Sequence, residues 1–288
     1  MWGQRLKPFH EVSRAIAPER LVEIDGQRIH AARSGRGRPL LLLHGLTASH
    51  YSFRHLAPLL EEGFELIAID LNGFGLTERP RREEHYLLDH QADLIARVLD
   101  SLGIGECDVL AHSYGAAVAS TLAKLHSLRV GKLVFVSPAS AFDPLPWYVR
   151  TALGKELFFR LVCLLLSDPK RYHRLAGRAF HVEGSFTEAD SEVYRSYLLV
   201  EGLRDAWYGF FRSMRDPAFP GSAYDDLDHP LLVLAGGHDA IVPLWKCQEL
   251  VGRLRRARLE VIPDCGHSAP EEVPAEVAAR VRFFLAEC

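Results

Sequence analysis

Short apolar segments alternate with amphipathic segments along most of this chain, and this alternation limits the possible folds more than any other feature. Residues 40–44 are too short and too uniformly apolar to form anything but a strand buried on both faces. Residues 64–70 and 107–113 predict further strands, and residues 90–103 and 114–126 predict helices. Because strands that alternate with helices are joined by right-handed crossovers, the sequence predicts a parallel sheet with helices on both faces.

The same pattern extends in both directions along the chain. Residues 21–34 predict two short strands around the Asp25-Gly26 turn, since Asp-Gly supplies the positive φ angles of a tight hairpin. The predicted fold class is a doubly wound α/β domain with a mostly parallel sheet. Its other expected elements are a strand at 132–138, a strand at 230–237, a helix near 245–256, a strand at 257–263 and a last helix at 271–287.

Residues 140–225 interrupt this alternation with a stretch that predicts only helices. Thr187, with Asp190 three residues later, resembles a capping box at the start of one of them. A helical insert in a parallel sheet has to pack somewhere, and ligands bind at the strand ends of such sheets, so we interpret the insert as a lid. The sequence thus predicts an α/β core of residues 1–139 and 226–288 with a helical cap at 140–225.

The composition excludes several classes of protein. With 288 residues, 48% hydrophobic and 25% charged, the chain has the averages of a soluble globular protein. A net charge of -3 gives no bulk field to attract nucleic acid, so no nucleic-acid partner is expected. The longest apolar run, Leu161–Leu166, is far shorter than the roughly 20 residues of a membrane span, so stable membrane insertion is not expected.

The cysteines and the N-terminus bear on the compartment. Five scattered cysteines form neither a C-x-x-C site nor an obvious disulfide framework, which favours a reducing environment. The first residues mix charge throughout and lack the apolar run of a secretory signal. We therefore expect a cytoplasmic protein, and its oligomeric state stays open.

The segment Ala111-His112-Ser113-Tyr114-Gly115 joins a predicted strand to a predicted helix and is the sharpest local signal in the chain. A serine at such a junction sits on a cramped turn, which explains the small residues Ala111 and Gly115. We expect its hydroxyl to project over the sheet, beside the free backbone N–H of Tyr114 at the helix N-terminus. As a bare tripeptide, Ser-x-Gly is also typical of a helix cap.

Two further side chains suit a nucleophilic arrangement with this serine. A serine hydroxyl is a weak nucleophile until a base takes its proton, and the base needs a third group to fix its tautomer. His267 follows the last predicted strand and Asp239 follows the strand before it. Both are therefore expected at the same edge of the sheet as Ser113. Asp143, which follows the strand after the serine turn, is an alternative acid.

Motifs at five places occur in the order, and on the elements, of a known superfamily. They are His44-Gly45-Leu46, Asp70-Leu71-Asn72-Gly73-Phe74-Gly75-Leu76-Thr77, the turn at Ser113, Gly237-His238-Asp239 with Val242-Pro243, and Gly266-His267 with Glu272 and Pro274. In these residues the chain resembles the α/β-hydrolase superfamily, in the branch with a helical cap, from about residue 21 to the C-terminus. It departs from the family at Ala111, where the family most often has glycine.

This resemblance implies a role for each matching position. Ser113 would be the nucleophile, His267 the general base and then the general acid, and Asp239 the group that orients the imidazole. The backbone N–H groups of Leu46 and Tyr114 would form the oxyanion hole. Because serine occupies the nucleophile position, the capped relatives that use aspartate there, epoxide hydrolases and haloalkane dehalogenases, are disfavoured.

Several other residues have structural interpretations, and neither a cofactor nor a metal is expected. Histidine pairs such as His50 and His55 stand five residues apart, which does not align two ligands on one helical face. Gly35-x-Gly37 precedes a strand instead of following one, so it is not a dinucleotide fingerprint. We interpret His44 as a hydrogen-bonding residue of the oxyanion loop, His112 and His238 as supports of their turns, and Cys265 as a packed loop residue.

Substrate choice is expected to come from the predicted cap, which is rich in aromatic residues. The candidates for a hydrophobic substrate pocket are Trp147, Phe158, Leu161, Trp207 and Phe211. The expected function is hydrolysis of small to medium hydrophobic carboxylic esters, or related acyl compounds, through an acyl-serine intermediate. The alternatives are a C–C hydrolase of vinylogous diketones with the same three residues, a lipase of monoacylglycerols, and a ligand-binding receptor with little turnover.

Overall fold

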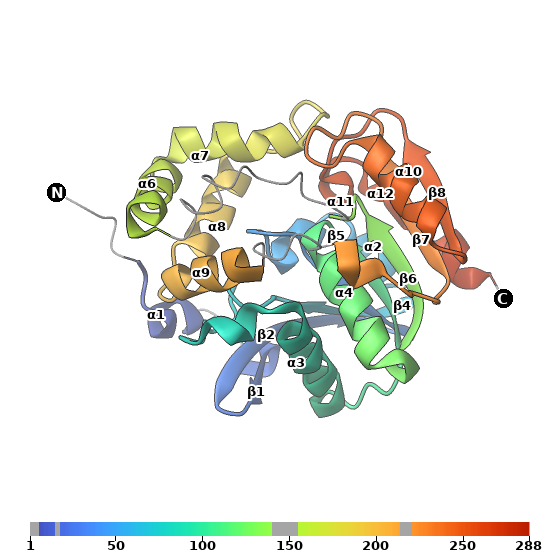
Figure 1. The fold of residues 1–288 in the computed structure, drawn as a ribbon, viewed down its shortest axis with the longest axis horizontal. Coiled ribbons are helices and arrows are strands. Elements are labelled where there is room, and N and C mark those ends of the chain that lie inside the picture. Colours follow the sequence, from blue (N-terminus) through green and yellow to red (C-terminus); the bar gives the residue numbers. More distant parts are fainter. Residues whose placement is uncertain (1–5, 15–17, 140–154, 214–220, 288) are drawn as a thin grey trace.

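The computed structural model describes residues 6–14, 18–139, 155–213 and 221–287, and an eight-stranded sheet lies at its centre (Figure 1). The strand order is β1-β2-β4-β3-β5-β6-β7-β8. β2 pairs antiparallel with β1 and β4, and the pairs from β4 to β8 are all parallel. This is the mostly parallel α/β fold that the sequence predicts. The strands are β1 (Leu21–Ile24), β2 (Gln27–Gly35), β3 (Arg38–Leu43), β4 (Phe64–Ile69), β5 (Cys107–His112), β6 (Val130–Val136), β7 (Leu231–Gly236) and β8 (Ala257–Ile262).

Burial on both faces explains the uniformly apolar strands. Leu41 and Leu43 of β3 belong to one hydrophobic core, and Leu40 and Leu42 belong to the core on the opposite face. Successive side chains of a strand point to opposite faces, so a strand between two cores needs apolar residues at every position. A short run of uniformly apolar residues in the sequence therefore predicts a central strand of the sheet.

Two sets of helices cover these faces. One set packs on the side of Leu41 and Leu43, and α3 and α4 of this set lie side by side in Figure 1. It consists of α3 (Leu88–Ser101), α4 (Tyr114–Leu125) and α10 (Leu244–Arg253). The other set packs on the side of Leu40 and Leu42 and consists of α2 (Ala57–Leu60), α11 (Ala269–Glu272) and α12 (Pro274–Ala286).

In the part of the chain described between β6 and β7, four helices form a separate group, on the left of Figure 1. They have a small apolar core of their own, which includes Phe159, Tyr172 and Tyr194. The predicted boundary at residue 140 lies outside the described residues, so the division into core and cap at 140–225 stays a prediction. The helices are α6 (Glu156–Ser167), α7 (Pro169–Ala176), α8 (Glu188–Leu198) and α9 (Leu203–Ser213).

Local signals account for where these helices begin. The expected capping box opens α8: the hydroxyl of Thr187 accepts from the backbone N–H of Asp190, whose carboxylate accepts from the N–H of Thr187. α7 is a helix that the sequence analysis did not predict. Pro169 is its first residue, and the side chain of Asp168 caps the N–H of Arg171.

The last predicted helix, 271–287, is two helices in the structure. Val273 between α11 and α12 has the non-helical angles φ −137° and ψ 54°. The reason is Pro274, because a residue before proline is forced away from the helical region. Within the described ranges, no helix has both the length and the apolar character needed to cross a membrane.

Short elements complete the described fold. The N-terminal segment touches the group of four helices, since the N–H of Lys7 donates to the carbonyl of Leu199 and its carbonyl accepts from the N–H of Glu201. These elements are α1 (Phe9–Ser13) and the 3₁₀ turns η1 (Pro18–Arg20), η2 (His50–Phe53), η3 (Glu83–Tyr86), η4 (Ser127–Arg129), η5 (Gly177–Ala179) and η6 (Gly221–Tyr224).

Candidate active site

Ser113 lies on the turn between β5 and α4 in a strained backbone conformation. Its φ of 52° and ψ of −116° are rare for a residue with a side chain, and such strain gathers at functional sites. The turn is tight because α4 approaches β3 closely: a Cβ at Gly115 would lie 2.5 Å from the carbonyl oxygen of Leu43. The small residue at 115 that the sequence analysis noted therefore has a steric cause.

Ser113, His267 and Asp239 form a continuous chain of contacts. Nε2 of His267 lies 3.0 Å from the hydroxyl oxygen of Ser113, and Nδ1 lies 2.8 Å from Oδ2 of Asp239. The other carboxylate oxygen of Asp239 accepts from the N–H groups of Ile241 and Val242, both at 2.8 Å. The structure thus brings together three side chains that the sequence placed at separate strand ends.

Burial and hydrogen bonds act in opposite directions on the acid of this chain. Burial raises the pKa of Asp239, but the hydrogen bond and charge of His267 and the two backbone donors bring it below its ordinary value. Asp239 is therefore a carboxylate at neutral pH. An ionised acceptor on Nδ1 holds the proton there and leaves Nε2 free to accept one from Ser113.

Glu272 ties the histidine loop to the cap helices. Its Oε2 accepts from the backbone N–H groups of His181 at 2.7 Å, Val182 at 2.9 Å and Gly266 at 3.1 Å. Its Oε1 accepts from the N–H of Ser268 at 3.0 Å. His181 and Val182 precede α8, whereas Gly266 and Ser268 flank His267. One buried carboxylate therefore fixes the position of the histidine loop relative to the residues between α7 and α8.

The loop after β3 lies against the serine turn, as the predicted oxyanion hole requires. A Cβ at Gly45 would be 3.1 Å from the Cβ of Ser113, and the next residue, Leu46, lines the cavity that contains Ser113. His44 holds this loop: its Nε2 accepts from the N–H of Leu71 at 3.0 Å, and its Nδ1 lies 2.8 Å from the carbonyl oxygen of Gly45. Burial lowers the pKa of His44, so it is a neutral, structural residue.

Of the other residues next to the site, His112 and Cys265 are buried, whereas His238 is exposed. Nε2 of His112 lies 2.9 Å from the carbonyl oxygen of His267, and burial lowers the pKa of His112 to about 3. The ring of His238 stacks on that of His181 with centroids 4.0 Å apart. Cys265 is fully buried, and burial raises the pKa of its thiol. Asp143, the alternative acid, lies outside the described residues.

Two cavities meet at Leu46 and Thr47. The polar cavity contains Ser113 and His267 and is lined further by Ser52, Tyr172, Phe180, Phe186, Tyr194 and Glu271. The apolar cavity is lined by Phe74, Phe159, Leu166, Trp207, Phe210 and Phe211, among others. The cavity volume is about 130 Å³ for the polar cavity and about 50 Å³ for the apolar cavity, so each has room for only a small group.

Two of the five predicted pocket residues line these cavities. Trp207 and Phe211 are in the wall of the apolar cavity, and Trp147 lies outside the described residues. Phe158 and Leu161 are in the described lining of neither cavity, and Leu161 is 50% exposed, so their part in a substrate pocket stays a prediction. The inward face of α6 carries Phe159, Val162, Cys163 and Leu166 instead, so the sequence analysis chose the neighbouring face of an all-round apolar helix.

Glu271 and Arg54 are residues of the site that the sequence analysis missed. Glu271 is 7% exposed and lines the polar cavity, and its carboxylate forms an ion pair with Arg54. A second nitrogen of Arg54 lies 2.9 Å from Oδ1 of Asp190 on α8. The available signal was two adjacent glutamates, Glu271 and Glu272, four and five residues after His267.

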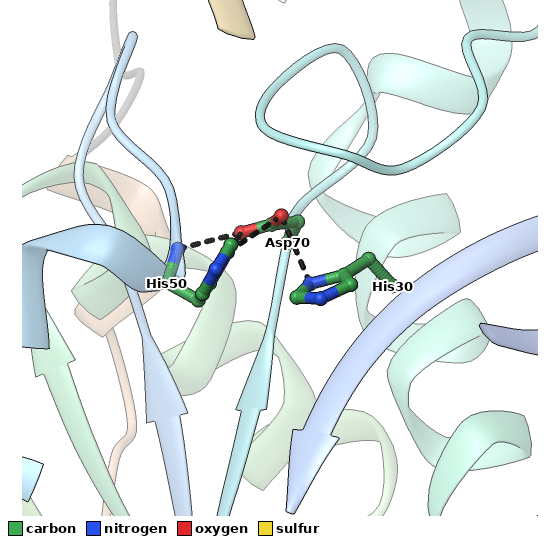
Figure 2. A group of neighbouring side chains, drawn as sticks. All are labelled: His30, His50 and Asp70. Carbon is green, nitrogen blue, oxygen red and sulfur yellow. Dashed lines mark hydrogen bonds and ion pairs between the residues drawn. The ribbon is translucent and has the colours of Figure 1, made fainter. Parts of the chain in front are cut away.

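His30, His50 and Asp70 form a separate cluster, shown in Figure 2. Nδ1 of His30 lies 3.1 Å and Nδ1 of His50 lies 3.0 Å from Oδ2 of Asp70. Their possible ligand atoms all lie within 4.8 Å of one another, so these three residues could hold a metal ion. The carboxylate also accepts from the backbone N–H groups of His50 at 2.6 Å and Leu76 at 2.8 Å, so it already organises two loops.

Comparisons with known proteins assign the class of this fold and site. Residues 38–274 match the family model described as alpha/beta hydrolase fold. The chain belongs to this family, and it is a hydrolase.

Two curated relatives and one solved structure show how broad the family is. Over 271 residues, which cover 91% of this chain and 92% of the relative, the chain is 29% identical to a 2-hydroxymuconate semialdehyde hydrolase from Pseudomonas sp. (strain CF600). It is 28% identical to epoxide hydrolase 3 from Xenopus tropicalis, covering 91% of this chain and 76% of the relative. The epoxide hydrolase CorEH, solved without ligand, superposes with a TM-score of 0.77 at 25% identity, over 92% of this chain and 97% of that one.

Proposed function

We propose that this hydrolase cleaves hydrophobic carboxylic esters that carry no negative charge, through an acyl-serine intermediate. The observation that carries the proposal is the contact chain from the hydroxyl of Ser113 through His267 to the carboxylate of Asp239, with spacings of 3.0 and 2.8 Å. These are hydrogen-bond distances, so a proton can pass from the serine to the imidazole without a rearrangement of the fold. Ser113 and His267 line the polar cavity, which is large enough for a small acyl group.

In the proposed mechanism, Ser113 attacks the ester carbonyl carbon while Nε2 of His267 takes the hydroxyl proton. The tetrahedral oxyanion is stabilised by the backbone N–H groups of Leu46 and Tyr114. The imidazolium then gives its proton to the leaving alcohol as the C–O bond breaks, which leaves an acyl-serine. Water, deprotonated by the same imidazole, attacks this acyl group, and the acid is released with the serine restored.

The walls of the two cavities disfavour an anionic substrate. Their described lining residues include no lysine and no arginine, and Glu271 adds a carboxyl to the polar cavity. A substrate carboxylate would have to leave water without a cationic partner, which is unfavourable at a buried site. The aromatic and aliphatic walls instead gain free energy by covering the apolar chain of an ester.

The relatives favour a second candidate, a C–C hydrolase that uses the same residues on ring-cleavage products. One relative is named for 2-hydroxymuconate semialdehyde, a compound that carries a carboxylate. The absence of cationic side chains from the described lining argues for the ester over such an acid. Epoxide hydrolysis is disfavoured because serine occupies the position of the proposed nucleophile.

A single panel of substrates tests the choice. p-Nitrophenyl esters of increasing acyl length, a ring-cleavage dienone and an epoxide are each assayed for kcat/KM. We expect an ester to be the best substrate and Ser113→Ala to reduce its turnover about 10⁴-fold or more. Ser120→Ala is the matched control, since Ser120 is a fully buried serine of α4 that lines neither cavity.

Each alternative has its own outcome in this panel. A dienone preferred more than about 100-fold over the best ester would make ester cleavage a side reaction. An active Ser113→Ala protein, purified free of other esterases, would remove the proposed mechanism. Stoichiometric binding of an ester without product would favour a receptor.

We further propose a reducing compartment, such as the cytoplasm, with the small-molecule substrate as the partner. The cysteines among the described residues, Cys107, Cys163, Cys247 and Cys265, are all free thiols. Free thiols persist where glutathione and thioredoxin keep them reduced.

A further inference from the structure

We propose that Glu271 recognises a hydrogen-bond donor, a hydroxyl or an ammonium group, on the part of the substrate that fills the polar cavity. The inference rests on the proposed function, because it assumes that the substrate reacts at Ser113. It adds a substrate class: esters with an apolar body and a donor away from the scissile bond. Three features of the structure support it.

The first feature is position. Glu271 is the third residue of α11, four residues after His267, and it lines the same cavity as Ser113. The lining of this cavity also contains Tyr172, Phe180 and Phe186. A ligand that fills the cavity from the serine therefore meets aromatic rings and a carboxyl.

The second feature is an imbalance of charge. Arg54 is the cation that pairs with Glu271, and it is shared with Asp190. The carboxylate of Asp190 also accepts from the hydroxyl of Tyr51 at 2.9 Å and from the capping box of α8, and these contacts hold its pKa below the ordinary value. One guanidinium thus faces two carboxylates, and all three side chains are largely buried.

The protonation of Glu271 reflects this imbalance. Burial raises the pKa of Glu271 to about 7, although Arg54 and the hydroxyl of Tyr194 oppose the shift. The contacts that the protein makes with the ionised carboxylate of Glu271 therefore do not offset the free-energy cost of burying its charge. A donor from a ligand would supply the missing hydrogen bond, and hydrogen bonds to charged groups are the stronger ones.

The third feature is the contrast with the apolar cavity. None of the described residues in its wall carries a charge, and its polar side chains are those of Thr47 and Cys163. A substrate with one apolar end and one donor end would therefore bind in a single orientation, with the donor toward α11.

The experiment measures binding apart from turnover. p-Nitrophenyl esters are prepared in three forms that differ only at the end of the acyl chain, which carries a methyl, a hydroxyl or an ammonium group, over a series of chain lengths. A second set carries the same groups on the alcohol portion. Dissociation constants are measured by calorimetry on the Ser113→Ala protein, which cannot complete the reaction.

We expect a donor form to bind about tenfold more tightly than its methyl form at the best chain length. Adding Glu271→Gln should reduce this ratio to near one for ammonium and to a few-fold for hydroxyl, because a neutral amide oxygen accepts more weakly. Adding Glu271→Asp keeps the charge on a shorter side chain, so the preferred chain should become longer. Glu276→Gln on α12 is the matched control: it removes a glutamate that is ion-paired with Arg280 outside both cavities.

The outcomes separate the two proposals. A donor preference near one at every chain length, in both sets, would overturn the role of Glu271 even if the esters are good substrates. A preference that survives Glu271→Gln unchanged would also overturn it. A preference that depends on Glu271, in a protein that hydrolyses none of the esters, would keep the recognition site and reject ester hydrolysis.

Discussion

The apolar cavity and the polar cavity share a wall at Leu46 and Thr47 but offer a ligand different surroundings. Both have aromatic walls: Trp207 and Phe211 pack with ring centroids 4.3 Å apart in one, and Phe180 and Phe186 stack at 4.6 Å in the other. The polar cavity adds hydroxyl and imidazole groups, among them those of Ser113 and His267, and one buried carboxyl, Glu271 on α11. We therefore expect the apolar cavity to select ligands by size and the polar cavity to select them by polarity.

This comparison has a general physical basis. Burial of apolar surface is favourable in any orientation and grows with area, so the apolar cavity discriminates weakly, about 1–3 kcal/mol per methylene. A buried polar group left without a partner costs free energy, so the polar cavity discriminates by chemistry. Both depend on the same His267 loop for reaction.

Loss of the Glu272 carboxylate should lower activity more than a change in either cavity wall. It should lower the turnover of ligands of both cavities equally. In Glu272→Gln an amide N–H₂ replaces one of the two accepting oxygens and faces at least one backbone donor, so the histidine loop should shift from its position beside Ser113. We expect kcat to fall about 100-fold with little change in KM, since misplacement of a catalytic group by about 1 Å has costs of this order. Steady-state kinetics on short and long esters provide the measurement.

Glu272→Asp is the second variant, and thermal unfolding of both variants shows whether they remain folded. The shorter carboxylate keeps the charge and should restore part of kcat. A folded Glu272→Gln protein with kcat within twofold of the original would show that Glu272 does not position His267.

The polar cavity should make the stability of the protein depend on pH. The pKa of Glu271 rises from its ordinary value of 4.5 to about 7 on folding, so the folded state holds this proton more tightly than the unfolded state. The stabilisation is complete below about pH 4.5 and is lost as the pH rises through about 7. Between about pH 5 and pH 8 the free energy of unfolding should fall by about 2 kcal/mol from this group.

Urea unfolding of the original protein and of Glu271→Gln at both pH values tests this. The variant should lack that part of the pH dependence, because glutamine does not titrate. Equal pH dependence in both proteins would mean that Glu271 is not the titrating group, and would weaken the contrast between the cavities.

The apolar cavity should give the smallest of these effects, confined to chain length. Trp207→Leu removes part of its wall and should lower kcat/KM for longer acyl chains about tenfold while sparing acetate. Leu161→Ala on the outer face of α6 is the comparison variant and should change kcat/KM less than twofold. Kinetics across acyl lengths measure both, and a larger loss for Leu161→Ala than for Trp207→Leu would contradict the assignment of the wall.

Local patterns were sufficient to predict much of this protein. The uniformly apolar run Leu40–Leu43 predicts a doubly covered strand, and Thr187 with Asp190 predicts the start of α8. Ser113, Asp239 and His267 follow β5, β7 and β8, which predicts that they meet at one edge of the parallel sheet. Their side chains do lie at hydrogen-bond distances from one another. In each case neighbours in the sequence, or the rule that parallel strands end together, carry the information.

The sequence failed where the decision depends on partners from distant segments. Both Phe158 and Phe159 are apolar and both lie near Trp207 of α9, but only Phe159 is buried and in the wall of the apolar cavity. The sequence also did not predict that His30 and His50, from two separate segments, both contact the carboxylate of Asp70 (Figure 2).

The sequence by itself determined the order of the strands and helices, the strained serine turn and the residue types at three strand ends, because each depends on short-range sterics and burial. Only the tertiary structure decided which aromatic residues form the cavity walls. It also decided that Glu271 is buried beside Arg54, which forms a second ion pair with Asp190. A carboxyl looks the same in a sequence whether water or protein surrounds it. Its surroundings, and therefore its chemistry, arise only when α8, α11 and the η2 segment pack together.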